Sequence, residues 1–213
     1  MFDPYCFQNL ELLVGQGLVP HSALSRSPLL VSEHMFVYNG VMSTQANTKI
    51  ILGIDPGLAN TGWGVIEAAG SKSCCLGYGC ITTAASEDTA VRLKIIHDDI
   101  LEIVACYEPS ALAIETIFFG ANVKTEVVTA EARGAALIAA ADAALEVGEY
   151  SPLQIKAAVV GTGSTEKSQV QYMVRALLGL KDIPSPDHAA DALAAALCHA
   201  RMGKHAAYER NAR

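Results

Sequence analysis

The segment Lys49-Ile-Ile-Leu-Gly-Ile-Asp55 is an apolar, β-branched run, and Pro56-Gly57 follows it directly. A run of this kind that ends in Pro-Gly predicts a buried strand closed by a turn. Residues 61–67 and 76–83 have a similar strand-like composition. Because the links between these segments are short and rich in turn residues, we expect three strands in an antiparallel meander.

Helical and strand-like patterns alternate after residue 87. Residues 88–107 place apolar side chains on one helical face, and residues 111–115 form a short apolar run without alternation, as in a buried central strand. The remaining segments predict a helix at 123–146, a strand at 149–153, and helices at 154–160, at 166–178 and from Ser185 onward. This order predicts an α/β fold, a mixed sheet with the first three strands antiparallel and helices packed on both faces.

The length of 213 residues, of which 51% are hydrophobic, predicts one large folded domain and excludes a disordered chain. The net charge of −7 argues at first against nucleic acid, because cationic side chains drive the binding of phosphates. The acidity, however, is concentrated in residues 1–48 and 85–108. Residues 150–181 carry four basic residues against Glu166, which makes them the best candidate for a DNA track.

The chain divides by pattern into three parts. Residues 1–48 sustain no period and are interpreted as an N-terminal extension, either poorly ordered or lying before the true start; residues 49–203 form the patterned domain, and residues 204–213 a short tail. No apolar run approaches the ~20 residues of a membrane span, and no basic cluster precedes a hydrophobic run. The six cysteines contain no C-x-x-C pair, so zinc spacing is absent and we expect a cytoplasmic protein.

Four side chains are candidates for a catalytic site. Asp55 and Glu115 end predicted strands, where open α/β sheets place ligands, and His188 and Asp191 share one face of an apolar helix. Each acid alone could cap a turn, and His188 could simply pair with Asp191. Together, three carboxylates would repel one another unless cations were bound, and oxygen-rich ligands favour Mg²⁺ or Mn²⁺. The chemistry would then be phosphoryl transfer or hydrolysis with two metals.

Four motifs, in order from about residue 49 to residue 200, resemble the RuvC family of Holliday junction resolvases. They are Ile51-Leu-Gly-Ile-Asp-Pro-Gly57 with Thr61-Gly-Trp-Gly-Val65, then Ala113-Ile-Glu-Thr-Ile-Phe118, then Gln154-Ile-Lys156 with Val159-Val-Gly-Thr-Gly-Ser-Thr-Glu-Lys-Ser-Gln-Val170, and finally Asp187-His-Ala-Ala-Asp-Ala-Leu193.

The resemblance implies a ribonuclease H-like fold, a homodimer and a Mg²⁺-dependent endonuclease that resolves Holliday junctions by paired, symmetric nicks leaving 5′-phosphate and 3′-hydroxyl ends. It implies two Mg²⁺ ions per subunit, with Mn²⁺ able to substitute, held by Asp55, Glu115, His188 and Asp191. Some relatives carry Asp in place of His188, so its role as metal ligand or general base stays open. The implied partners are four-way junction DNA and the branch-migration proteins RuvA and RuvB.

The resemblance also implies DNA contacts. Lys156 and Lys167 match basic family positions that hold the phosphate or offset transition-state charge, although solvated surface lysines are the alternative. Phe118 matches an aromatic that stacks on an unpaired base near the junction centre, with core packing as its alternative. Asp187 is interpreted as an acid at the helix N-terminus rather than as a ligand.

Other functions are less well supported. Gly161 to Ser168 nearly fits a phosphate-binding loop, but Glu166 replaces its second glycine, so we reject nucleotide binding. An ATPase of the actin and Hsp70 type needs a duplicated domain and a much longer chain. A non-catalytic scaffold for branched DNA or RNA, or another ribonuclease H-like nuclease acting on RNA, remain alternatives.

Overall fold

The computed structural model describes residues 48–117, 123–163 and 165–211, which fall within a single unit, Gln45–Arg213. Our expectation for residues 1–48 therefore lies almost wholly outside the described residues. Within the described ranges, no helix combines the length and the apolar character that crossing a membrane requires.

A five-stranded sheet with the order β3-β2-β1-β4-β5 forms the centre of the fold. Its strands are β1 (Lys49–Asp55), β2 (Asn60–Ala69), β3 (Lys72–Thr82), β4 (Ala111–Glu115) and β5 (Glu146–Tyr150). The first three strands pair antiparallel, whereas β4 pairs parallel with both β1 and β5. The predicted mixed sheet with an antiparallel meander is therefore confirmed.

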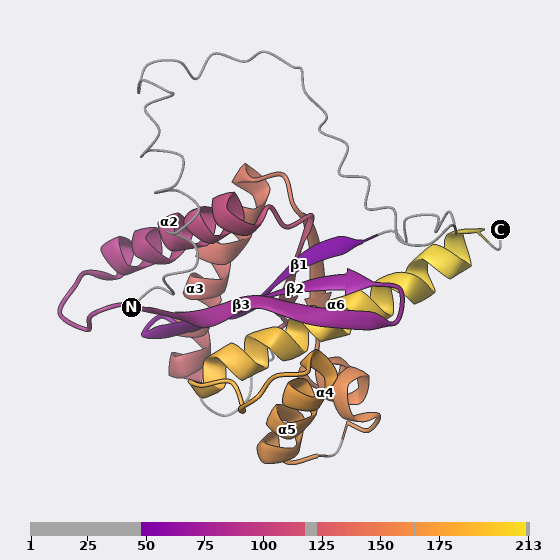
Figure 1. The fold of residues 1–213 in the computed structure, drawn as a ribbon. Helices are drawn as coiled ribbons and strands as arrows, with labels where there is room; N and C mark the ends of the chain where they lie inside the picture. The colour runs from indigo at the N-terminus through magenta and orange to yellow at the C-terminus, as the bar shows by residue number, and fades with distance from the viewer. Residues whose placement is uncertain (1–47, 118–122, 164, 212–213) are drawn as a thin grey trace, which may run out of the picture. The chain divides into compact units, whose positions relative to one another are not determined.

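Helices cover both faces of this sheet (Figure 1), as predicted. One face carries α2 (Thr89–Tyr107) and α3 (Val123–Asp142), and the other carries α6 (Asp187–Asn211) with α4 (Pro152–Val160) and α5 (Lys167–Leu178). Each layer has a hydrophobic core of its own, one under α2 and α3 and one under α4, α5 and α6.

Side chains along the central strand β4 alternate between these two cores. Leu112 and Ile114 belong to the core under α2 and α3, whereas Ala113 belongs to the core under α6. Since successive side chains of a strand point to opposite faces, Glu115 points to the α6 face.

Glycines on β1 and β2 allow α6 to lie directly against the sheet. A Cβ atom added to Gly53 would lie 2.0 Å from the carbonyl oxygen of Ala192, and one added to Gly62 would lie 2.0 Å from that of His188. A Cβ atom on Gly64 would lie 2.6 Å from the side chain of the leucine that follows Ala192. We call Gly53, Gly62 and Gly64 the glycine seat.

Two boundaries near β5 differ from the sequence prediction. α3 ends at Asp142 rather than at residue 146, because the backbone turns at Ala144, whose φ is 54°. β5 then begins at Glu146, before the predicted range of 149–153, and pairs with β4 in parallel. This strand carries two glutamates and one glycine among its 5 residues, and both residue types have a low propensity for strands, so its sequence does not predict a strand here.

The other differences are smaller. β3 begins at Lys72 rather than at residue 76. α4 begins at Pro152 rather than at residue 154, because Ser151 and Gln154 form a capping box at its start. The helix that we predicted from Ser185 begins at Asp187, and its extent to residue 211 takes in most of the segment 204–213.

Candidate active site

Asp55 and Glu115 are the last residues of the neighbouring strands β1 and β4, which run parallel with Ile54 opposite Ile114. In β1, Leu52 and Ile54 face α2 and α3, so Asp55 points to the α6 face, as Glu115 does. The carboxyl ends of parallel strands meet at one edge of the sheet. The two acids therefore lie near each other at this edge.

α6 brings His188 and Asp191 to the same edge. These two residues lie one turn apart near the start of the helix, which the glycine seat holds close to the sheet. Gly62 pairs with Asp55 across the β1–β2 ladder and lies under the carbonyl of His188. The absence of a side chain at position 62 is thus what lets His188 approach Asp55.

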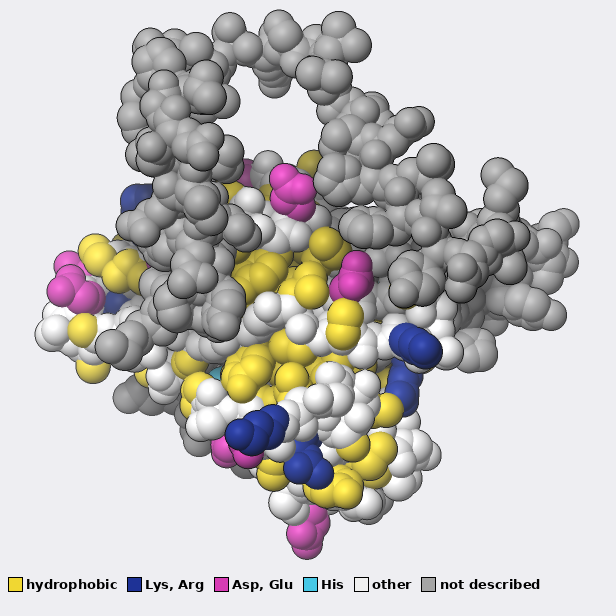
Figure 2. Space-filling view, viewed as in Figure 1, with side chains coloured by type: hydrophobic (Ala, Val, Ile, Leu, Met, Phe, Trp, Pro, Cys, Tyr) yellow, Lys and Arg dark blue, Asp and Glu magenta, His cyan; other side chains and the backbone are white. Residues whose placement is uncertain are grey.

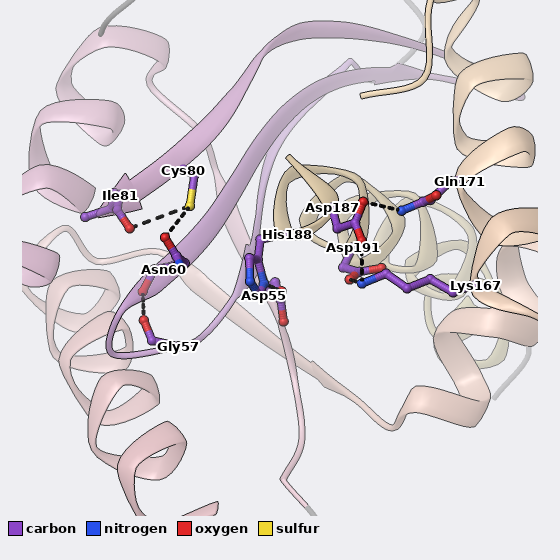
Figure 3. Close-up of polar contacts among 11 residues, drawn as sticks. Asp55, Gly57, Asn60, Cys80, Ile81, Lys167, Gln171, Asp187, His188 and Asp191 are labelled. Carbon is purple, nitrogen blue, oxygen red and sulfur yellow. Dashed lines mark hydrogen bonds and ion pairs between the residues drawn. The ribbon is translucent and has the colours of Figure 1, made fainter. Parts of the chain in front are cut away.

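His188 is hydrogen-bonded to Asp55 rather than to Asp191 (Figure 3). Its Nδ1 atom lies 2.7 Å from Oδ2 of Asp55. Burial raises the pKa of Asp55, the hydrogen bond with His188 opposes this rise, and the charge of Asp191 adds to it. Because the contact uses Nδ1, the ring nitrogen that points away from Asp55 is Nε2.

Lys167, at the start of α5, is ion-paired with the acids of α6 (Figure 3). Its Nζ atom lies 2.9 Å from Oδ2 of Asp191 and 3.5 Å from Oδ2 of Asp187. Gln171, one turn further along α5, donates to the other oxygen of Asp187 at 2.9 Å. The hydrogen bond with Asp191 raises the pKa of Lys167. Lys167 is therefore ion-paired with two acids of α6, while about half of its side chain remains exposed to solvent.

The electrostatics of Glu115 reflect its burial and its proximity to Asp55, Asp191 and Lys156. Burial, followed by the charges of Asp55 and Asp191, raises the pKa of Glu115 to about 7, while the charge of Lys156 opposes the rise. Burial is therefore the main cause of this high pKa, and the negative charge of the two neighbouring acids adds to it. Lys156 on α4 is near enough to offset part of that charge.

Two adjoining hollows meet at Glu115. One, of about 260 Å³, also has Asp55, Thr116 and Glu126 in its lining. The other, of about 250 Å³, is lined by Glu115 together with the three predicted residues Lys156, Lys167 and Asp191. The structure thus brings six of the seven predicted site residues to one edge of the sheet, whereas Phe118 lies outside the described residues.

The donor set suits a hard divalent cation. It offers three carboxylates and one imidazole, and a bound cation would offset both the burial and the mutual repulsion that raise the pKa values of Asp55 and Glu115. Among the residues that the structure describes, no three Asp, Glu, His or Cys side chains already surround a common point as metal ligands do. Asp55 is engaged by His188 and Asp191 by Lys167, so metal binding would require local rearrangement.

The structure also identifies residues at this edge that the sequence analysis missed. Arg133 of α3 donates from Nε to the carbonyl oxygen of Glu115 at 3.2 Å, and its guanidinium forms an ion pair with Glu149. The sequence marks Arg133 only weakly, as the one basic residue between positions 130 and 144. Gln171 could have been found from its spacing, since i and i+4 residues share a helix face with Lys167.

Basic side chains extend from the site over the α4–α5 lobe. Figure 2 shows Lys and Arg side chains on the lower part of this view, where α4 and α5 lie. Arg175 packs its guanidinium 5.2 Å from the centre of the Tyr172 ring, and its Nη1 donates to the carbonyl of Lys181 at 3.4 Å. The lobe thus combines positive charge with an exposed aromatic ring.

Comparison with known proteins gives a consistent result. A family model described as "Crossover junction endodeoxyribonuclease RuvC" matches residues 51–199. The protein of that name from Treponema pallidum (strain Nichols) is 49% identical over 154 residues, which covers 72% of this chain and 79% of that protein. Its counterpart from Halothermothrix orenii is 49% identical over 150 residues, covering 70% and 91% of the two chains.

Solved structures show the same relationship. The structure of T. thermophilus RuvC in complex with a Holliday junction substrate matches with a TM-score of 0.71 and 37% identity, covering 74% of this chain and 96% of that one. The yeast mitochondrial Holliday junction resolvase Ydc2 matches with a TM-score of 0.53 at 13% identity, covering 76% and 83% of the two chains, which is a likeness of fold alone.

Proposed function

This chain belongs to the RuvC family of crossover junction endodeoxyribonucleases, and we propose that it resolves Holliday junctions during DNA recombination and repair. The reaction is phosphodiester hydrolysis by paired, symmetric nicks that leave 5′-phosphate and 3′-hydroxyl ends. The observation that carries the proposal is that Asp55, Glu115 and Asp191 come together at one edge of the sheet in a chain with this family relationship; there, burial and the charges of the other two acids raise the pKa of Glu115 to about 7.

We propose Asp55, Glu115, His188 and Asp191 as the metal-binding and catalytic set, and two Mg²⁺ ions per subunit as the cofactor, with Mn²⁺ able to substitute. Such ions, when bound, polarise the scissile phosphate and stabilise the leaving oxygen. Because Nδ1 of His188 contacts Asp55, we assign the proposed role as ligand or general base to Nε2.

Lys156 and Lys167 would bind the scissile phosphate in this proposal. Their charges border the hollow that Glu115 and Asp191 line, so they can neutralise a phosphodiester placed there. Lys167 would exchange part of its ion pairing with Asp191 and Asp187 for the phosphate. Phe118, two residues past Thr116, would stack on an unpaired base at the junction centre, a contribution of about 1–3 kcal/mol.

The finer assignments also belong to the proposal. Two symmetric incisions require two active sites related by a two-fold axis, so the acting species is a homodimer. RuvA and RuvB are the proposed partners, and the cytoplasm is the proposed compartment. Residues 49–203 would form the nuclease domain, with residues 1–48 as an extension and residues 204–213 as a tail.

The test uses the full chain with a synthetic four-way junction and Mg²⁺, beside linear duplex and RNA–DNA hybrid controls. We expect symmetric nicks on the junction, sealed afterwards by DNA ligase, and loss of cleavage in Asp55→Asn. Asp98→Asn, which changes a half-exposed aspartate on α2 outside the site, is the matched control and should cleave normally. Junction binding without cleavage in Mg²⁺ or Mn²⁺ would instead indicate a scaffold, and preferred cutting of the hybrid would indicate an RNA-directed nuclease.

A further inference from the structure

The end of β4 is held differently on its two sides. Toward β1, regular pairing stops at Ile54 opposite Ile114, one residue before Glu115. Toward β5 it continues, because Glu115 lies opposite Tyr150 and the backbone N–H of Thr116 donates to the Tyr150 carbonyl at 2.8 Å. The register of β4 with β5 therefore extends one residue further than its register with β1.

Arg133 supplies a contact at this end of the strand. Its Nε donates to the carbonyl oxygen of Glu115 at 3.2 Å. The contact is made to the main chain and comes from α3, which covers the face opposite α6. The Glu115 carboxylate points toward α6, so Arg133 holds the backbone of Glu115 without neutralising the carboxylate.

Glu149 of β5 orients the arginine. It forms an ion pair with Nη2 of Arg133, and the Arg133 side chain is only 18% exposed. Nε and Nη2 lie on the same edge of the guanidinium, so one rigid group joins the end of β4 to β5. A lysine has a single ammonium on a flexible stem and cannot reproduce this bridge.

We propose that Arg133 is a positioning residue that fixes Glu115 for catalysis by clamping the end of β4 to β5. The catalytic part of this inference rests on the proposed nuclease function. Glu115 must keep a defined distance from Asp55 and Asp191, and a loose strand end would spread its carboxylate over several positions. Since misplacement of a catalytic group by about 1 Å can lower the rate about a hundredfold, a modest loosening should already be visible in kcat.

Two measurements on Arg133→Gln test this inference. Hydrogen exchange at the Thr116 amide, which donates to Tyr150, reports on the strand end without requiring any activity; we expect exchange about tenfold faster. Junction cleavage should show kcat reduced about tenfold with KM changed less than about twofold, because the change affects the reacting geometry rather than DNA contacts.

The matched control is Arg201→Gln. Arg201 also donates to a main-chain carbonyl, that of Ala158, but it joins α6 to α4 away from Glu115. The substitution Arg201→Gln should leave both hydrogen exchange at Thr116 and kcat unchanged. Arg133→Lys keeps the charge but not the bridge and should stay below wild-type kcat.

Several outcomes would overturn the inference. Wild-type exchange at Thr116 in Arg133→Gln would show that the clamp does not hold the strand. Three other results would remove the positioning role. They are faster exchange with an unchanged kcat, a KM that rises by the same factor by which kcat falls, and wild-type kcat in Arg133→Lys. A wild-type protein that cleaves no junction would defeat the proposed function instead, while the exchange measurement would still decide whether Arg133 holds the strand end.

Discussion

Gly62 offers a direct test of how the site is assembled. In Gly62→Ala, the new Cβ atom would lie 2.0 Å from the carbonyl oxygen of His188 and 2.9 Å from its Cβ atom. Since real Cβ atoms essentially never approach another atom within 3.0 Å, α6 or β2 would have to move by about 1 Å. The colliding oxygen belongs to the backbone, so no side-chain rotation can relieve the clash.

Two effects of this movement can be estimated. Overpacking of a close contact destabilises a protein by about 1–3 kcal/mol. For a chain of this length, that lowers Tm by about 2–12 °C. The same movement would lengthen the 2.7 Å contact between His188 and Asp55, and a catalytic group misplaced by about 1 Å can lose about a hundredfold in rate.

Thermal unfolding and junction cleavage together measure the two effects. Gly134→Ala is the matched control, because a Cβ atom at Gly134 of α3 meets no atom within 4 Å. That substitution should raise stability by about 0.5–1 kcal/mol, as alanine favours a helix interior more than glycine does. A Gly62→Ala protein with wild-type Tm and a kcat within about twofold of wild type would refute the reasoning.

Three further predictions follow from the charges. Lys167→Met should lower single-turnover cleavage about a hundredfold by removing the ammonium beside Asp191, whereas Lys181→Met should not. Nδ1 of His97 lies 3.0 Å from Asp98 and Nε2 lies 2.9 Å from Asp142, and these hydrogen bonds raise the pKa of His97. The stabilisation by protonated His97, which donates to both acids, should therefore be full below pH ~6.5 and disappear as the pH rises through the raised pKa. Tm measured against pH should show this loss in the wild type and not in His97→Gln. With a net charge of −7, junction affinity should depend less steeply on salt than in a strongly basic relative, as titrations at several salt concentrations would show.

Each of these has a clear contrary result. Wild-type cleavage by Lys167→Met would place Lys167 outside the phosphate-binding machinery. If Tm depends on pH in the same way in His97→Gln as in the wild type, protonated His97 does not stabilise the contact between α2 and Asp142 of α3. A salt slope as steep as that of a basic relative would show that the acidic regions do not act on bound DNA.

The strand ends could be predicted from sequence because their signals are local. A β-branched run closed by Pro56-Gly57 places Asp55 at the end of a strand. The apolar run 111–115 likewise identifies a buried strand that ends at Glu115. β5 was misplaced because its strand character depends on pairing with β4 rather than on its own residues.

Contacts between distant segments lie beyond sequence reasoning. Sequence spacing allowed His188 to pair with Asp191, but the structure pairs His188 with Asp55, 133 positions away. The contact of Arg133 with the Glu115 carbonyl leaves no pattern at all, because a main-chain acceptor is the same for every residue type. Packing of α6 on the glycine seat, rather than any local preference, brings His188 to Asp55.

The placement of α6 also matters for the growing chain. The acids of β1 and β4 are made early, whereas His188 and Asp191 belong to the last helix to be translated among the described elements. A nascent chain that has folded only its sheet therefore carries half of the proposed ligand set. DNA-cutting ability would arise in one late event, the docking of α6 on the sheet, so incomplete translation products should be harmless to the chromosome.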